Sequence, residues 1–212
     1  MVAGLLNDAA ETAPGHDGAA MRTAEALLLT PGAGGGADHR TLVDIDNALS
    51  SRLPVRRHDF AYRRAGRRAP PRAPSVVAEL VDDLPLIAAE LGVSPDGLVI
   101  GGRSFGGRVC SMAVADGARA AGLVLLSYPL HPPDRPERLR TEHFSRVGAP
   151  CLFVSGTRDP FATPDELGEH TRAIAGPVTL RFIDGARHDP SSAAARRAIV
   201  EHVGDWLDTL GA

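Results

Sequence analysis

The sequence lacks lysine entirely, and all 23 of its basic side chains are arginines. This absence excludes Schiff-base chemistry, a serine–lysine dyad and a phosphate-binding loop built on lysine. The excess of one sign of charge over the other is also small, because the formal net charge is only −3. Such a molecule has no overall field that would recruit nucleic acid or an anionic membrane. We therefore expect neither of these partners.

Cysteine is nearly absent too. Cys110 and Cys151 lie in apolar stretches, and neither has a second cysteine or a histidine at metal-ligand spacing. Buried thiols in a reducing cytoplasm are the simplest interpretation, and no metal site is expected. The N-terminus lacks the pattern of a signal peptide, and no apolar run approaches the ~20 residues that cross a bilayer. These features predict a cytoplasmic protein.

The length of 212 residues fits one domain. Residues 1–22 show no sustained periodicity and are expected to form a flexible leader before a single domain at 23–212. We expect Asp38 and Ser75 to cap helices, and Pro85 to kink or shorten the second of them. Apolar periodicity predicts strands at 24–29, 55–62, 98–100, 123–126, 151–154 and 178–183, and helices at 38–53, 75–91, 105–116, 164–175 and 191–210.

Continuously apolar strands that alternate with helices indicate an α/β fold. The expected architecture is a mostly parallel sheet of six to seven strands with helices on both faces. In such sheets, reactive side chains gather in the loops after the carboxyl ends of the strands. Residues 127–149 are too few for a large helical lid, so we expect a short flap over an open, shallow pocket.

The turn at 102–106, with the sequence GRSFG, follows an apolar strand and precedes a helix. This is the context of a nucleophile elbow, in which Ser104 is held in strained backbone geometry. The neighbours must then lack side chains, and glycines stand on both sides. The helix that follows would aim its N-terminal N–H groups at the site. A glycine-rich helix start that only packs tightly or binds phosphate is the alternative interpretation.

A serine nucleophile needs a base, and the base needs a carboxylate that orients it. Asp159 follows one predicted strand and His188 follows the next, so both lie at the same sheet edge as Ser104. The chain order Ser, Asp, His is that of α/β hydrolases. Asp189 and Asp134 remain alternatives to Asp159.

The other histidines are weaker candidates for the site. His131 lies in a loop that could face the site, and it is our reserve candidate for a substrate contact. His39, His170 and His202 fall on predicted helices, where solvated or capping roles are common. His58 follows the start of a strand, which suits a core histidine.

Several segments together resemble a family of small α/β-hydrolase-like proteins related to dienelactone hydrolases. These segments are PGAGG at 31–35, GRSFGGR at 102–108, SYPLHPP at 127–133, SGTRDPF at 155–161 and GARH at 185–188. Bacterial members of that family are regarded as hydrolases, and relatives occur in a subunit of a eukaryotic histone-acetyltransferase complex. The resemblance implies Ser104 as nucleophile, His188 as general base and Asp159 as its orienter.

Acyl transfer also needs two donors for the oxyanion. We expect the backbone N–H of Phe105 and, from the glycine-rich loop at 32–36, that of Ala33, because only small residues allow such close approach. The loop lacks a clean Gly-x-Gly-x-x-Gly pattern with a following acidic residue, so no dinucleotide cofactor is expected. A histidine commonly precedes this loop in the family, whereas Pro31 stands here, which puts the donor assignment in question.

Arginines cluster between the second predicted strand and the next helix, at positions 56, 57, 63, 64, 67, 68 and 72. They could bind an anionic substrate or partner, although a solvated loop is the simpler interpretation. Arg103, within the elbow, and Arg158, beside Asp159, could reach the pocket or brace its loops. Arg103 is therefore a candidate for substrate binding.

The sequence thus favours a serine hydrolase that cleaves a small-molecule ester, thioester or lactone through an acyl-enzyme, without a cofactor. The alternative is a non-catalytic interaction module that keeps the α/β-hydrolase fold and an inert triad.

Overall fold

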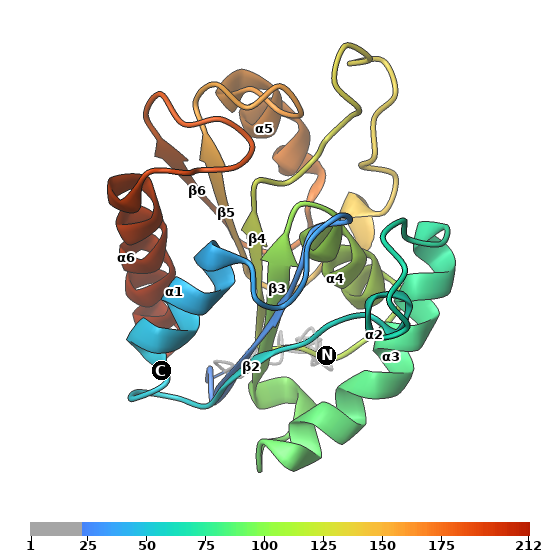
Figure 1. Cartoon of the computed structure of the whole chain (residues 1–212), viewed down its shortest axis with the longest axis vertical. Helices are drawn as coiled ribbons and strands as arrows, with labels where there is room; N and C mark the ends of the chain where they lie inside the picture. The colour runs from blue at the N-terminus through green and yellow to red at the C-terminus, as the bar shows by residue number, and fades with distance from the viewer. Residues whose placement is uncertain (1–22) are drawn as a thin grey trace, which may run out of the picture.

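The computed structural model describes residues 23–212, so the leader predicted at 1–22 lies outside the described part (Figure 1). Six strands form one sheet in the order β2-β1-β3-β4-β5-β6, and every neighbouring pair is parallel. This arrangement confirms the predicted α/β class and parallel sheet. The strands are β1 (Ala26–Thr30), β2 (Val55–Arg57), β3 (Leu98–Arg103), β4 (Gly122–Leu126), β5 (Cys151–Gly156) and β6 (Val178–Ile183).

Helices cover both faces of the sheet (Figure 1). On one face lie α1 (Arg40–Leu49) and α6 (Ala193–Thr209), and on the other lie α3 (Ala73–Glu90) and α4 (Phe105–Ala115). The short helices α2 (Ala61–Arg64) and α5 (Pro164–His170) complete the chain, with single 3-10 turns at Pro95–Gly97, Phe144–Arg146 and Thr171–Ala173.

Two apolar cores explain why the central strands read as continuous hydrophobic runs. Successive side chains of a strand point to opposite faces, so Leu28 of β1 packs with α3 and α4, whereas Leu27 and Leu29 pack with α1 and α6. Trp206 closes the second core from α6. Because both faces are covered, every residue of β1, β4 and β5 is buried.

The second predicted strand was too long. It ends at Arg57, and the chain turns into the four-residue helix α2, although Phe60 and Tyr62 alternate as strand residues would. Both rings are buried because they stack on each other at 6.1 Å between centroids, and Phe60 meets Phe105 edge-on. Aromatic packing, rather than strand pairing, produced the alternating pattern.

The two predicted helix caps were also wrong. His39, not Asp38, is the N-cap of α1, where its Nδ1 accepts the N–H of Thr41 at 3.3 Å. Helix α3 begins at Ala73 behind Arg72, before the expected Ser75, because Pro74 suits the first turn of a helix. The helix also runs through Pro85 to Glu90, so the proline does not shorten it.

Both cysteines are free and buried, as predicted. Burial raises the pKa of each thiol, of Cys110 and of Cys151 alike, to about 12. These thiols stay protonated near neutral pH and are therefore poor nucleophiles. None of the helices at 23–212 has both the length and the apolar character needed to cross a membrane.

Candidate active site

The candidate nucleophile stands at the junction of β3 and α4. Ser104 has φ 52° and ψ −115°, a region that residues with a side chain rarely adopt. Its N–H donates to the carbonyl of Leu126 in β4 at 2.8 Å, which anchors this backbone to the sheet. Strain of this kind costs about 1–3 kcal/mol and is held only by its surroundings.

The glycines around Ser104 are required by the end of β1. A Cβ at Gly102 would lie 2.2 Å from the carbonyl oxygen of Thr30, and one at Gly106 would lie 2.4 Å from the Thr30 hydroxyl. Both distances are far below van der Waals contact, so any larger residue would push the elbow away from β1. The glycine pattern therefore reflects a close approach of backbone to backbone.

A chain of hydrogen-bond contacts joins three loops that follow β3, β5 and β6. The Oγ of Ser104 lies 2.9 Å from Nε2 of His188, and the Nδ1 of His188 lies 2.8 Å and 3.0 Å from the two carboxylate oxygens of Asp159. The Asp159 side chain is fully buried, whereas that of His188 is 17% exposed. A serine, a histidine and an aspartate in this arrangement can act as a nucleophile, a base and a group that orients the base.

Phe161 supports both partners of the serine. Its backbone N–H donates to Oδ1 of Asp159 at 2.9 Å, and its ring lies over the His188 ring with centroids 4.0 Å apart. The carboxylate keeps a fixed position because it accepts bonds from two sides. The imidazole is confined because one of its faces is covered.

The competing aspartates lie elsewhere. Asp189 has its carboxylate next to Arg103 and His39, at 3.3 Å from each, rather than at the His188 ring. Asp134 is exposed in the segment between β4 and β5, with φ 60°. Asp159 is thus the carboxylate that contacts His188.

The glycine-rich loop after β1 lies against the nucleophile. A Cβ placed on Gly32 would be 3.7 Å from the Cβ of Ser104, so the loop passes beside the serine despite Pro31. The hydroxyl of Tyr62 donates to the carbonyl of Ala33 at 3.0 Å and holds the loop from α2. Phe105 is the first residue of α4, a position whose N–H has no intrahelical partner. The two expected donors therefore lie on the two segments that flank Ser104.

The comparisons with known proteins agree with this architecture. A family model described as an alpha/beta hydrolase domain matches residues 23–201. The chain belongs to this family. The match spans all six strands and the loops that carry Ser104, Asp159 and His188, so the family assignment covers the whole candidate site of this α/β hydrolase.

Solved structures show the same fold at low sequence identity. Est1E from Butyrivibrio proteoclasticus has a TM-score of 0.71 at 14% identity, over 89% of each chain. The dienelactone hydrolase from Anabaena variabilis has a TM-score of 0.71 at 16% identity, over 88% of this chain and 87% of that one. An alpha-beta serine hydrolase homologue from Coxiella burnetii has a TM-score of 0.64 at 17% identity, over 86% and 83%. At such identities the likeness concerns the fold.

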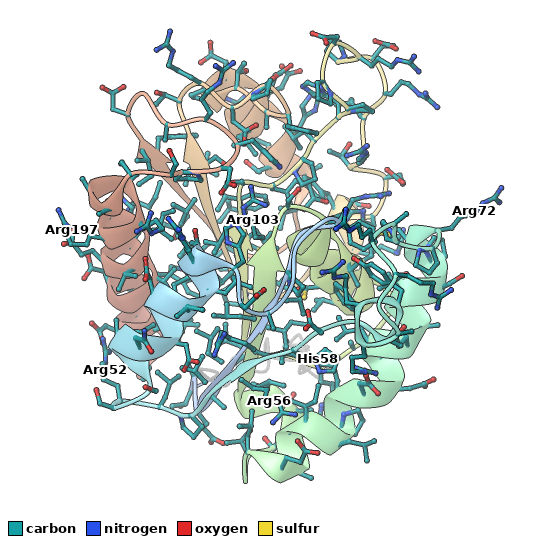
Figure 2. All side chains as sticks on the ribbon, in the orientation of Figure 1. Arg52, Arg56, His58, Arg72, Arg103 and Arg197 are labelled. Carbon is teal, nitrogen blue, oxygen red and sulfur yellow. The ribbon has the colours of Figure 1, made fainter. Side chains whose placement is uncertain are left out.

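The structure places the two predicted substrate-binding residues inside the α/β hydrolase rather than on an open surface. His131 is 5% exposed, with Nδ1 2.8 Å from the carbonyl of Pro132 and Nε2 3.3 Å from a carboxylate oxygen of Glu166. The Arg103 side chain is 13% exposed, and its Nη2 donates to the backbone carbonyl of His188 at 3.1 Å. Figure 2 shows Arg103 near the centre of the molecule. These contacts favour bracing roles, and substrate contact stays a prediction.

Three of the seven clustered arginines lie close to carboxylates of the protein. Arg57 contacts Asp46 at 2.8 Å and donates to the carbonyl of Ala37, Arg56 lies 3.6 Å from Glu90, and Arg64 is close to two carboxylates of α3. Arg72 projects away from the body of the molecule (Figure 2). The hollow beside this cluster, of about 660 Å³, carries both signs of charge on its walls. The region thus resembles a solvated, internally paired surface more than an anion site.

Metal chemistry has no candidate ligand set within residues 23–212, where no group of three or more histidine, cysteine or acidic side chains is arranged to hold an ion.

Sequence reasoning missed two supports of the site. Phe161 ends the family-like segment at 155–161, which could have drawn attention to it. Tyr62 gave no signal, because its alternation with Phe60 resembled a strand.

Proposed function

We propose that this α/β hydrolase is a serine hydrolase that cleaves small esters, thioesters or lactones through an acyl-enzyme on Ser104. The observation that carries the proposal is the continuous chain from the Ser104 hydroxyl through His188 to buried Asp159. Each of its contacts spans 2.8–3.0 Å, within the range of a hydrogen bond.

The hydrogen-bond partners of His188 indicate which of its ring nitrogens carries the proton. The ionised carboxylate of Asp159 only accepts hydrogen bonds, so Nδ1 of His188 carries a proton and Nε2 presents a lone pair to Ser104. As Ser104 attacks the acyl carbon, its proton passes to Nε2, and buried Asp159 stabilises the imidazolium that forms. The imidazolium then protonates the leaving oxygen or sulfur. In the second step, water gives a proton to Nε2 of His188 and attacks the acyl carbon. The bond between this carbon and Ser104 Oγ then breaks, the imidazolium returns a proton to Oγ, and the acid is released.

Negative charge develops on the carbonyl oxygen during both steps. The backbone N–H groups of Phe105, at the start of α4, and of Ala33, in the loop after β1, would donate hydrogen bonds to this oxygen. The N-terminus of α4 adds a favourable dipole at that place. Removal of one such donor typically costs about 2.7–4 kcal/mol in the barrier.

The segment between β4 and β5 favours a small substrate. In the described chain this stretch contains only the 3-10 turn Phe144–Arg146, so it offers no helical cap over the serine. A long acyl chain would find little apolar cover there. The dienelactone hydrolase with the same fold acts on a lactone by its name, which suits the substrate class proposed.

A fluorophosphonate probe tests the proposal directly, because it phosphonylates activated serines irrespective of the natural substrate. We expect one label per chain and none on Ser104→Ala. The variant should fold normally, since it removes a single oxygen. Equal labelling of the variant would contradict the assignment, and a wild-type protein that never labels would favour the non-catalytic module.

A panel of p-nitrophenyl esters, aryl thioesters and small lactones then tests the substrate class. We expect kcat/KM to be highest for short acyl groups and to fall as the chain lengthens. A steady rise of kcat/KM toward long acyl chains would contradict the open, shallow pocket that we expect.

A further inference from the structure

Three charged or polar side chains from distant parts of the chain meet beside the candidate base. Arg103 ends β3, His39 precedes α1, and Asp189 directly follows His188. One carboxylate oxygen of Asp189 lies 3.3 Å from Nη2 of Arg103 and 3.3 Å from Nε2 of His39. None of these contacts belongs to the serine–histidine–aspartate chain.

Arg103 connects this cluster to the base and to the nucleophile. The Nη2 that faces Asp189 also donates to the backbone carbonyl of His188 at 3.1 Å. Its Nη1 lies beside the glycine-rich loop, where a Cβ on Gly32 would be only 3.1 Å away. One guanidinium thus touches the loop that carries the base and the loop expected to supply an oxyanion donor. Its backbone, in turn, immediately precedes Ser104.

His39 completes the connection without needing a charge. Its Nδ1 accepts the N–H of Thr41 at 3.3 Å, so the neutral ring carries its proton on Nε2 and presents that proton to Asp189. The ring also lies next to the glycine-rich loop, with Cδ2 3.9 Å from the Cβ position of Gly35. Burial and the charge of Arg103 lower the pKa of His39, which favours this neutral form.

Several charged and polar groups surround His188, and they contact different parts of it. Asp159 contacts the ring, Asp189 and Arg103 lie along the backbone of His188, and His39 acts on Asp189. Arg158 and Arg187, the exposed sequence neighbours of Asp159 and His188, are screened by solvent. Arg103 is different because its guanidinium is largely buried. Asp189 is the carboxylate in direct contact with it.

We propose that Arg103, Asp189 and His39 form a positioning network that holds the His188 loop against the glycine-rich loop and balances the charge felt by the imidazole. The network acts on the proposed serine hydrolase activity and rests on that proposed function. Arg103 places its positive charge at the backbone carbonyl of His188, whose ring must itself become positive during catalysis. Asp189 neutralises this charge, and His39 holds Asp189 in place.

Charge-removing variants at the two ends should move the pH profile in opposite directions. Arg103→Gln removes the positive charge, so the acid limb of kcat/KM should move up by about half a pH unit. Asp189→Asn leaves Arg103 unbalanced, so the limb should move down by about as much. The double variant should return close to the wild-type position. Shifts of the same sign, or none in either variant, would overturn the proposal.

The lysine variant separates charge from geometry. Arg103→Lys keeps the positive charge but cannot reach the His188 carbonyl, Asp189 and the Gly32 loop at once. We expect the acid limb to stay in place while kcat falls about tenfold and KM changes little. An increase in KM at constant kcat would instead assign Arg103 to substrate binding and overturn the positioning role.

A matched ion pair at the opposite edge of the sheet provides the control. Arg119 and Asp96 form an exposed pair before the amino ends of β4 and β3. Arg119→Gln and Asp96→Asn should leave the pH profile unchanged. A shift of the same size in these variants would show a general charge effect and overturn the specific role.

Failure of the network and failure of the proposed function remain distinguishable. Fluorophosphonate labelling of Ser104 reports the function, whereas the position of the acid limb reports the network. Asp189 is 62% exposed at its side chain, so Asp189→Asn should fold even if an Arg103 variant does not. If Asp189→Asn folds and is labelled but the acid limb of its kcat/KM profile stays at the wild-type position, the network is refuted and the proposed function is not.

Discussion

Helix α4 carries two serine–histidine pairs that look alike by distance. Ser104 Oγ lies 2.9 Å from Nε2 of His188 at the start of the helix, and Ser111 Oγ lies 2.8 Å from Nε2 of His143 two turns later. The partners have the same chemistry and nearly the same separation. Distance between a hydroxyl and an imidazole therefore does not identify a nucleophile.

The surroundings of the two pairs differ in two features that matter for catalysis. His188 has a buried carboxylate on its second nitrogen, whereas Nδ1 of His143 is buried and has no hydrogen-bond partner among the described residues. Ser111 donates its proton to the carbonyl of Arg108 at 2.9 Å, so it accepts from His143 and has no proton to offer it. The second pair is a structural contact of the core.

The removal of each serine hydroxyl should give the largest contrast. Ser104→Ala should lower kcat/KM by about 10⁴-fold or more, because the acyl-enzyme cannot form. Ser111→Ala should retain activity and instead lose about 1–3 kcal/mol of stability, because the buried N–H of His143 loses its acceptor. Esterase assays and urea unfolding of both variants measure the two effects. Comparable losses of activity would remove the distinction between the pairs.

Asp159 is the carboxylate that the second pair lacks. Asp159→Asn keeps the shape but turns a pure acceptor into a group that also donates, so the imidazole loses its fixed tautomer. We expect kcat to fall by about 10³–10⁴-fold with KM little changed. Steady-state kinetics at the pH optimum measures this loss. Retention of more than a tenth of kcat would mean that another carboxylate serves His188.

Buried His143 should affect the stability of the protein at acidic pH rather than its activity. Burial lowers the pKa of His143 to about 4. Between this pH and about pH 6.5, the unfolded chain therefore binds a proton at this residue that the folded chain does not bind. The resulting stability is complete above about pH 6.5 and is lost as the pH falls toward 4, by about 3 kcal/mol at most. Urea unfolding at pH 7 and pH 4.5 measures it.

His143→Gln keeps a donor for Ser111 and removes the titration. Its stability should therefore change less between the two pH values than that of the wild type. An equal loss in variant and wild type would assign the acid sensitivity to His39 and His58, whose pKa values burial also lowers.

The smallest contrast concerns two tyrosines, one that contacts the glycine-rich loop next to Ser104 and one that lies beside Ser111. Tyr62 holds the Ala33 carbonyl of the glycine-rich loop, and Tyr128 donates to the Arg140 carbonyl beside Ser111. Tyr62→Phe should lower kcat about 3- to 10-fold as the loop loosens, whereas Tyr128→Phe should leave kcat unchanged and cost about 1 kcal/mol. Kinetics and thermal unfolding of the two variants decide between these outcomes. A drop in kcat for Tyr128→Phe alone would reverse the comparison.

Much of the fold followed from local patterns. The apolar runs of the four inner strands, β1, β3, β4 and β5, were recognisable because residues buried on both sides of a sheet have little freedom to be polar. Boundaries failed where packing replaced pairing, as at Phe60 and Tyr62. The cap at His39 was missed because its role depends on a ring nitrogen that faces the Thr41 N–H.

The sequence by itself indicated where the sharp turn around Ser104 lies, because glycines at 102 and 106 allow the close approach of this turn to the end of β1. It also determined which loops share the carboxyl edge of the sheet. Only the tertiary structure decided that Asp159, and not the adjacent Asp189, meets His188, and that Asp189 joins Arg103 and His39. Such choices depend on how side chains turn after distant strands are brought together, which composition and periodicity do not encode.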